Sequence, residues 1–345
     1  MKKFLFHRTK QNEQTEKAPK HHHSKKQNLT YGILIAVIVV FVICWWGQAL
    51  TNAYYKAFVE YSDENASEII ESNSRMSIDT DVSNELQPLQ EEFDSWRNRH
   101  LADQCSVVSQ DGTTLHGLYY DCGFDRTVIV FQGYAVNSTG DFLYAPWYEQ
   151  EQCNVLLTDV RSSGGSEGAY LSYGLCEQCD VAVWVDYARN ELGNQNIYLH
   201  GIGMGTSAVL TAAGNGLLSG QVDGIVAESA FGSLHELAEY EMGYWFRLPT
   251  FPLLNLINAK MEGTVGYGLD DVNLTALVQS SEIPAVFLAA GADKYLPAEY
   301  SQEVYEAYAG TKRWLEVSDA EHGALYLRGK DDVQQAIKSL LDGTI

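Results

Sequence analysis

The sequence predicts an α/β domain with a doubly wound, mostly parallel sheet, preceded by one transmembrane helix. Three observations lead to this prediction. A run of about 20 uncharged residues lies near the N-terminus, short apolar segments alternate with helix-like stretches after it, and the charge changes sharply between the two regions. With 345 residues, 46% of them hydrophobic, the chain can bury a large core.

Residues 31–50, which read YGILIAVIVVFVICWWGQAL, form the predicted transmembrane helix. About 20 apolar residues at 1.5 Å each cross a hydrocarbon core of ~30 Å, and the rings of Tyr31, Trp45 and Trp46 suit the two interfaces. A buried core helix is the first alternative, but the run has no polar face. A cleaved signal peptide is the second, but the basic leader is long and no small-residue cleavage site follows Trp46.

Charge predicts the orientation of this single-pass protein in the cell membrane. Residues 1–30 hold eight of the 23 Lys and Arg and two of the 45 acids, so a leader of +6 precedes a body of −28. A basic leader stays in the cytoplasm, which places the C-terminal domain outside. An acidic body repels phosphate backbones and argues against nucleic-acid binding. Its acidity otherwise indicates a solvated surface or, alternatively, steering of a cationic ligand.

The cysteines and histidines predict neither a metal nor a cofactor. The histidines at 21–23 (HHH) favour a solvated tail, with a metal-attracting tract as the alternative. Cys176 and Cys179 have redox-motif spacing but no second pair, so a plain helix face is favoured. If Asp111–Gly112 forms a two-residue turn, Cys105 pairs with Leu118, about four residues out of register with Cys122 and too far for a disulfide.

The chain after the helix divides into an acidic, helical stalk or packed entry segment (51–100) and the α/β domain (101–345). Within the domain, a hairpin precedes apolar runs that alternate with helix-like stretches, which predicts a parallel sheet covered on both faces. A long aromatic- and Leu-rich segment, about 231–281, suits a lid. The predicted strands are 106–110, 114–120, 127–131, 155–158, 197–200, 222–227, 285–290 and 314–317, and the helices include 52–59, 84–99, 178–192, 204–213 and 300–308.

Chemistry-bearing residues follow these strands, where a doubly wound sheet places its site. Read in chain order, the turns are Phe131-Gln132-Gly133-Tyr134, then DVRSSGGSEG from Asp159 to Gly168, then HGIGMG from His200 to Gly205, then Glu228-Ser229, then Gly291-Ala292-Asp293, and last Ala320-Glu321-His322-Gly323.

This order resembles the α/β-hydrolase superfamily, specifically membrane-anchored bacterial serine esterases and peptidases. The resemblance runs from about Cys105 to the C-terminus, with a similar anchor ahead of it. It rests on an oxyanion motif after the first parallel strand, an Asp-x-Arg loop, an elbow of the Gly-x-Ser-x-Gly type, an acid after a late strand and a final histidine. It implies an α/β-hydrolase fold with a helical lid and no cofactor.

Elementary chemistry assigns a role to each position. Gly201, Gly203 and Gly205 allow the sharp strand-to-helix turn, and the next helix points backbone N–H groups at the site. The amides of Met204 and Tyr134 would face a developing oxyanion. Asp293 and His322 would hydrogen-bond as an oriented general base, within about 2.6–3.2 Å. The alternatives are a turn-capping acid and a surface histidine.

The departures from the pattern concern the same pocket. Position 203, where the family keeps its nucleophilic serine, is glycine, which offers no atom for acyl transfer. Gln132 stands in place of the oxyanion histidine, Ser163 in place of the loop histidine, and Glu228 in place of an aspartate; with Gly133 these residues complete the predicted pocket. A Gly-x-Gly-x-Gly run also resembles a dinucleotide motif, but its third glycine comes too soon.

Three functions remain open from the sequence. The first is a catalytically degenerate member that binds a small-molecule or peptide-like ligand or a partner. The second is an active hydrolase of ester, thioester or peptide-like substrates, in which Asp293 and His322 activate water or a substitute nucleophile. Ser207, Ser229 and Ser166 are the serines to consider, and none is expected to have the strained, exposed placement of an elbow residue. The third is a structural stalk protein.

Overall fold

The computed structural model describes residues 25–60, 62, 80–134, 136, 138 and 142–345. The chain forms two compact units, one ending at Gly47 and the other beginning at Gln48. Most of the predicted basic leader, the histidine tract at 21–23 and much of the middle of the 51–100 segment lie outside the described residues.

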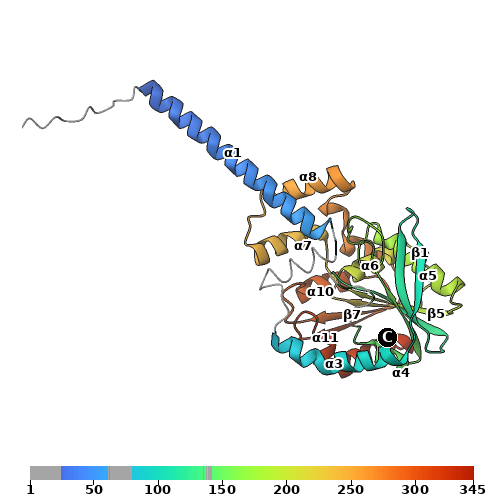
Figure 1. Cartoon of the computed structure of the whole chain (residues 1–345). Coiled ribbons are helices and arrows are strands. Elements are labelled where there is room, and N and C mark those ends of the chain that lie inside the picture. Colours follow the sequence, from blue (N-terminus) through green and yellow to red (C-terminus); the bar gives the residue numbers. More distant parts are fainter. Residues whose placement is uncertain (1–24, 61, 63–79, 135, 137, 139–141) are drawn as a thin grey trace, which may run out of the picture. The chain divides into compact units, whose positions relative to one another are not determined.

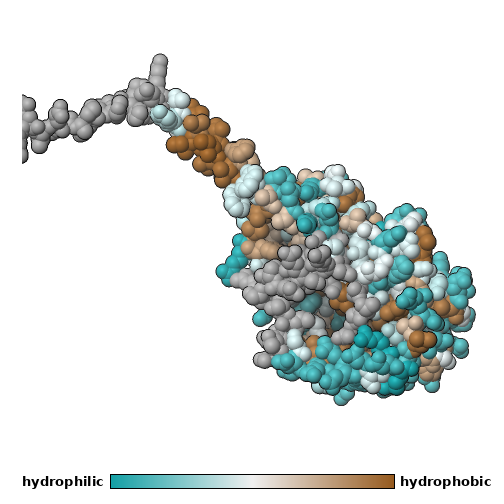
Figure 2. All heavy atoms as spheres, in the orientation of Figure 1, coloured by the Kyte–Doolittle hydropathy of each residue, from teal (hydrophilic) through white to brown (hydrophobic). Residues whose placement is uncertain are grey.

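Helix α1 (Lys25–Phe58) contains the apolar run predicted to cross a membrane. Among the described residues, the segment Leu29–Phe58 of this helix is the only one long and apolar enough to cross a membrane. A signal sequence near the N-terminus would meet the same criteria of length and composition. Large apolar side chains such as Ile35 and Phe41 are exposed along it. Figure 2 shows a hydrophobic surface along this helix. From Gln48 onward, α1 belongs to the same unit as the domain.

The sheet has eight strands in the order β1-β2-β4-β3-β5-β6-β7-β8. The first three are joined by antiparallel pairings, and all pairings from β4 to β8 are parallel (Figure 1). Apolar runs such as VIV and VLL in the central strands are buried on both faces, as parallel strands require. The bounds are β1 Asp103–Val108, β2 Thr114–Tyr120, β3 Arg126–Phe131, β4 Cys153–Thr158, β5 Asn196–Ile202, β6 Gly224–Glu228, β7 Ala285–Ala290 and β8 Lys312–Val317.

Helices cover both faces of this sheet, so the predicted doubly wound α/β architecture is confirmed. One buried cluster joins the sheet to α5, α6 and α10, and a second joins the other face to α3, α4 and α12. The helical bounds are α3 Thr80–Arg99, α4 Ala145–Gln150, α5 Glu177–Asn190, α6 Met204–Gly214, α7 Leu234–Glu241, α8 Leu253–Val265, α9 Leu274–Leu277, α10 Ala298–Ala307, α11 Leu325–Arg328 and α12 Lys330–Leu341, with short turns η1 Met242–Phe246, η2 Leu269–Asp271 and η3 Val278–Ser280.

The hairpin register differs from the prediction by one residue. Cys105 pairs with Gly117 instead of Leu118. The reason is the loop: Ser109 N donates to Thr113 O, so three residues, Gln110–Gly112, form the turn instead of two. None of the six cysteines is disulfide-bonded.

Helix α3 is a packed entry segment, which was one of the two alternatives for residues 51–100. Phe93 and Trp96 are fully buried against the sheet, and the Trp96 indole Nε1 donates to Glu149 Oε2 at 2.9 Å. The burial of two large aromatic residues contributes several kcal/mol, which ties α3 to the domain. The described part of this segment is therefore not a free stalk.

The predicted lid region is a helical insertion between β6 and β7. It comprises α7, η1, α8, η2, α9 and η3, in place of the single crossover helix that two neighbouring parallel strands require. Side chains from its first part, including Phe231, Leu237 and Trp245, line the cavity described below. The insertion therefore supplies one wall of the candidate site.

Candidate active site

A cavity of about 480 Å³ opens at the carboxyl ends of the central strands. Asp293 does not line the cavity itself but hydrogen-bonds to His322, which does. The predicted site residues that line the cavity are Gln132, Gly133, Tyr134, Gly203, Met204, Glu228 and His322. Parallel strands end at one edge of the sheet, so turns far apart in sequence meet there.

The strand-to-helix turn at Gly203 has the sharp geometry that the sequence predicts. Gly203 has φ +53° and ψ −110° and precedes the first residue of α6. Its N–H donates to Glu228 O at 2.9 Å, and the hydroxyl of Thr206 donates to the same carbonyl at 2.6 Å. The end of β6 thus holds the turn in place.

The three glycines of the turn differ in what surrounds them. A Cβ at Gly205 would lie 1.8 Å from Phe131 O, and one at Gly201 would lie 2.5 Å from Thr206 Cα, so both positions must be glycine. At Gly203 the nearest atom would be Leu296 Cδ1 at 3.6 Å, an ordinary contact. Position 203 therefore has room for a side chain directed at the cavity, and only its backbone conformation favours glycine.

Asp293 and His322 form the hydrogen-bonded pair predicted from their places after β7 and β8. His322 Nδ1 lies 2.8 Å from Asp293 Oδ2, and Asp293 Oδ1 accepts from the amides of Tyr295 and Leu296. This leaves Nε2 of His322 as the ring nitrogen available to the cavity. The Tyr295 ring stacks on the imidazole with centroids 4.5 Å apart. The contact is present, and its catalytic role stays a prediction.

The charge around His322 favours its protonated form. Burial alone would lower the pKa of His322, but the charge of Asp293, the hydrogen bond to it and the charge of Glu228 raise that pKa above 6.5. With 38% of its side chain exposed, the imidazole can exchange protons with solvent.

A buried polar network behind the cavity holds Glu228. Tyr144 donates to Glu228 Oε2 at 2.7 Å, His200 Nε2 lies 3.2 Å from the same oxygen, and Tyr148 lies 3.0 Å from His200 Nδ1. The aromatic residues of this network come from α4 and the turn before it, and no sequence signal connects them to the end of β6. Glu228 is thus occupied by internal hydrogen bonds.

Ser163 does not line the cavity, which corrects the predicted pocket. It is buried in the loop after β4, its N–H donates to Val160 O at 3.0 Å, and its hydroxyl has no hydrogen-bond partner among the described residues. The loop is wound around Asp159, whose carboxylate accepts from Ser138 N and Gly165 N. That winding turns Ser163 inward.

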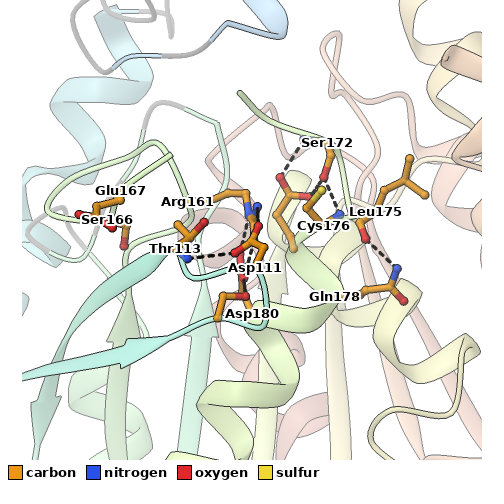
Figure 3. Close-up of polar contacts among 12 residues, drawn as sticks. Asp111, Thr113, Arg161, Ser166, Glu167, Ser172, Leu175, Cys176, Gln178 and Asp180 are labelled. Atoms are coloured by element: carbon orange, nitrogen blue, oxygen red, sulfur yellow. Dashed lines mark hydrogen bonds and ion pairs between the residues drawn. The ribbon is translucent and has the colours of Figure 1, made fainter. Parts of the chain in front are cut away.

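An ion-pair network fixes the start of this loop (Figure 3). Arg161 donates two parallel hydrogen bonds of 2.7 Å to Asp180 and a third, of 2.9 Å, to Asp111. Arg161 and Asp180 are both buried. Removing one partner of such a buried pair typically costs about 3–5 kcal/mol, so the arginine of the Asp-x-Arg motif acts here as a structural residue.

The last turn of α1 also contributes to the cavity, which sequence reasoning missed. Phe58 is one of the lining side chains, Tyr134 Oη donates to Ala57 O at 2.8 Å, and Tyr54 Oη donates to Glu241 Oε2 at 2.9 Å. The apolar run and the site are thus connected by one helix.

Glu241, a buried residue of the cavity, should make the free energy of unfolding depend on pH. Burial raises the pKa of Glu241 to about 8, and the hydrogen bond from Tyr54 lowers it only in part. The folded chain therefore keeps a proton between about pH 4.5 and 8 that the unfolded chain releases. Within this window the free energy of unfolding should fall as pH rises, by up to about 1.4 kcal/mol per unit from this group, and level off above it.

Glu241→Gln should remove this contribution, since an amide oxygen still accepts from Tyr54 and carries no charge. We expect the variant to be more stable than wild type at pH 8.5 and to have a flatter pH profile, measured by urea unfolding between pH 5 and 9. The control is Glu239→Gln, at a site on the same helix. Equal slopes for wild type and Glu241→Gln would contradict the burial of a protonated carboxyl.

Comparisons with known proteins agree with this architecture. No protein-family model matches the sequence. YqkD of Bacillus subtilis, an uncharacterised protein, is 27% identical over 218 residues, which cover 63% of this chain and 71% of YqkD. YfhR of Escherichia coli K12, also uncharacterised, is 25% identical over 231 residues, or 64% of this chain and 73% of YfhR.

Solved structures similar to this chain include two esterases. An esterase of Pyrococcus furiosus matches with a TM-score of 0.57 and 20% identity, over 71% of this chain and 91% of the esterase. Acetyl xylan esterase 1 of Thermoanaerobacterium matches with a TM-score of 0.51 and 18% identity, over 76% of this chain and 94% of that enzyme. The domain thus has the α/β-hydrolase fold, as the sequence predicted. At these identities the likeness shows the fold alone.

Proposed function

We propose that this chain is a membrane-anchored, extracytoplasmic binding protein that retains the architecture of a serine hydrolase without covalent serine catalysis. One observation carries the proposal: Gly203 holds the strained turn geometry beside an intact Asp293–His322 pair, and position 203 carries no hydroxyl. A water molecule or ligand group would occupy the space beside Gly203, in reach of the amide at the start of α6.

The cavity chemistry favours an uncharged, largely apolar ligand. Its described lining includes Phe58, Phe142, Phe231 and Trp245 and contains no Lys or Arg to pair with a carboxylate or phosphate. Glu241 is protonated at neutral pH, and Glu228 is held by Tyr144. A neutral ester, ketone or amide with an apolar chain satisfies these conditions.

Ligand binding can be measured through Trp245. Detergent-solubilised full-length chain would be titrated with medium-chain methyl ketones and with carboxylates of the same length, while tryptophan fluorescence is followed. We expect the ketone to bind at least about tenfold more tightly, because the described lining has no Lys or Arg and the charge of a protonated His322 is already balanced by Asp293. Leu237→Trp, which fills the cavity, should weaken binding, and Leu256→Trp on an exposed helix face should not. Equal affinity for both ligands would contradict the proposed ligand class.

The alternative, an active hydrolase, gains one specific observation. Ser229 lines the cavity and has φ +52°, so it has the strained backbone expected of an elbow residue, although it is buried and not exposed. The hydroxyls of the other two serines are committed elsewhere: Ser207 donates to Tyr173 O and Ser166 to Asp159 O. Hydrolysis of an ester panel by wild type, lost in both Ser229→Ala and His322→Ala, would establish this alternative; loss in His322→Ala alone would indicate activated water.

The membrane orientation is a separate prediction. The +6 leader and the uncharged run of α1 favour a cytoplasmic N-terminus. Protease added to intact cells or spheroplasts should therefore digest the C-terminal domain, with a cytoplasmic marker protein as the control for integrity. Complete protection of the domain in sealed cells would contradict the proposed location.

A further inference from the structure

A cluster of three potential metal ligands lies on the α3–α4 side of the domain. His100 directly follows α3, Cys122 follows β2, and Glu149 belongs to α4. One ligand atom from each, the imidazole nitrogen, the thiol sulfur and a carboxylate oxygen, lies within 4.8 Å of the others. All three residues are half-buried, and none of them lines the cavity at Gly203.

Hydrogen bonds around the cluster orient two of these ligands. His100 Nδ1 lies 2.9 Å from the carbonyl oxygen of Trp96, which can only accept, so Nδ1 carries a proton. The Nε2 atom, free of that proton, lies 3.1 Å from Glu149 Oε1. The second oxygen of Glu149 accepts from the Trp96 indole at 2.9 Å. A metal-binding histidine and carboxylate are usually held in this way by their outer atoms.

Two acceptor atoms thus face each other across 3.1 Å, and a cation must lie between them. A proton, which would make His100 an imidazolium, is one possibility, and a metal ion is the other. The third group favours a metal ion. Cys122 adds a sulfur beside the pair, which a simple His–Glu ion pair does not require.

The distances suit a small ion of tetrahedral preference. With Zn–N and Zn–O bonds of about 2.0–2.1 Å and a Zn–S bond of about 2.3 Å, tetrahedral ligands lie about 3.3–3.6 Å apart. The observed N–O separation of 3.1 Å is close to this value, and because all three ligand atoms lie within 4.8 Å of one another, binding would require them to approach by at most about 1.5 Å. Nitrogen, sulfur and carboxylate donors are the set that Zn²⁺ prefers.

We propose that His100, Cys122 and Glu149 bind one Zn²⁺ ion or a similar divalent metal, with the fourth position open to water. On binding, Cys122 releases its thiol proton to solvent, while the His100 Nε2 lone pair and a Glu149 carboxylate oxygen complete the protein ligands. The site would clamp the C-terminal end of α3 to α4 and to the end of β2. Its role is then to fasten the segment that enters the domain from the membrane side of the chain.

Cobalt spectroscopy on the full-length, detergent-solubilised chain tests this site. Because residues 21–23 are a histidine tract, the measurements use a background in which His21, His22 and His23 are each alanine. After chelation under reducing conditions, Co²⁺ should bind at one equivalent and give a thiolate-to-cobalt charge-transfer band. Cys122→Ser should abolish the band. Cys179→Ser, which changes a half-buried cysteine of the Cys176–Cys179 pair, should leave it unchanged.

Affinity and stability provide measurements that do not depend on the sulfur band. We expect His100→Gln and Glu149→Gln each to weaken Zn²⁺ binding at least about tenfold, and Trp96→Phe, which removes the donor to Glu149, to weaken it about 10–100-fold. Zn²⁺ should raise the melting temperature of the tract-free chain and leave that of Cys122→Ser unchanged. Two outcomes would overturn the proposal. One is the absence of a cobalt band in the tract-free chain, a test that needs no ligand variant to fold. The other is a band that survives Cys122→Ser.

Discussion

Gly203→Ser is expected to convert the wild-type chain, which should not react with a fluorophosphonate, into one that is labelled at the introduced serine and slowly hydrolyses a short activated ester. The new hydroxyl would lie at the turn after β5, beside the His322 imidazole and near the amides of Met204 and Tyr134. We expect a rate at least about 10²-fold above wild type. This is well below the roughly 10⁶-fold that a serine nucleophile contributes in a fully adapted protease.

Three structural facts support a gain of this kind. A Cβ at position 203 meets only Leu296 at 3.6 Å, so the side chain fits. The acid–base pair is already hydrogen-bonded at 2.8 Å. The predicted oxyanion donors are backbone groups, which the substitution retains. Serine at φ +53° costs about 1–3 kcal/mol of strain, and Gln132 stands where the resemblance implies an oxyanion histidine, so recovery should be partial.

The reaction should depend on His322 and on pH. Because the general base must be neutral, the rate should rise with pH through a midpoint above 6.5, in line with the raised pKa of His322. The double variant Gly203→Ser/His322→Ala should lose the activity, and Gly203→Ala should never gain it. A well-folded Gly203→Ser variant that stays unreactive would mean that more of the site than the nucleophile has been lost.

Gly205→Ala should have the largest effect on stability. Its methyl group would lie 1.8 Å from the carbonyl oxygen of Phe131 and 2.4 Å from the carbonyl carbon, so the backbone of β3 or α6 must move. We expect a loss of about 3 kcal/mol or more, measured by urea unfolding and thermal melts, or no folded protein. At about 2–4 °C per kcal/mol, the melting temperature should fall on the order of 10 °C.

Two other glycines provide matched controls. Gly203→Ala, two residues away, adds the same methyl group with only an ordinary contact to Leu296 and should cost only its backbone strain, about 1–3 kcal/mol. Gly263→Ala, on the exposed face of α8 with no neighbouring atom within 4 Å, should be neutral or slightly stabilising. If Gly205→Ala were as stable as Gly263→Ala, the close packing of α6 on β3 would be wrong.

Local sequence patterns determined the fold class, the apolar helix and the acid–histidine pair. Buried parallel strands are short apolar runs, so the segments that became β3 to β8 could be recognised without knowledge of their partners. Asp293 and His322 could be paired because strand ends in such a sheet share one edge, and the structure joins them at 2.8 Å. The predicted register of the β1–β2 hairpin was wrong by one residue, because a three-residue turn and a two-residue turn share the same Asp-Gly signal.

Only the tertiary structure decided which side chains surround the site. Three features depend on contacts between distant segments, which no local pattern encodes: the packing of α3 on the sheet, the contact of Tyr54 with Glu241, and the inward turn of Ser163. The residues in the second of these contacts are 187 positions apart. The strained backbone of Ser229 arises in the same way, from the path that the chain must take between β6 and the insertion. The sequence alone therefore predicted that a nucleophile is missing at position 203, and the structure added that this position has space for a side chain and lies in a sharp strand-to-helix turn.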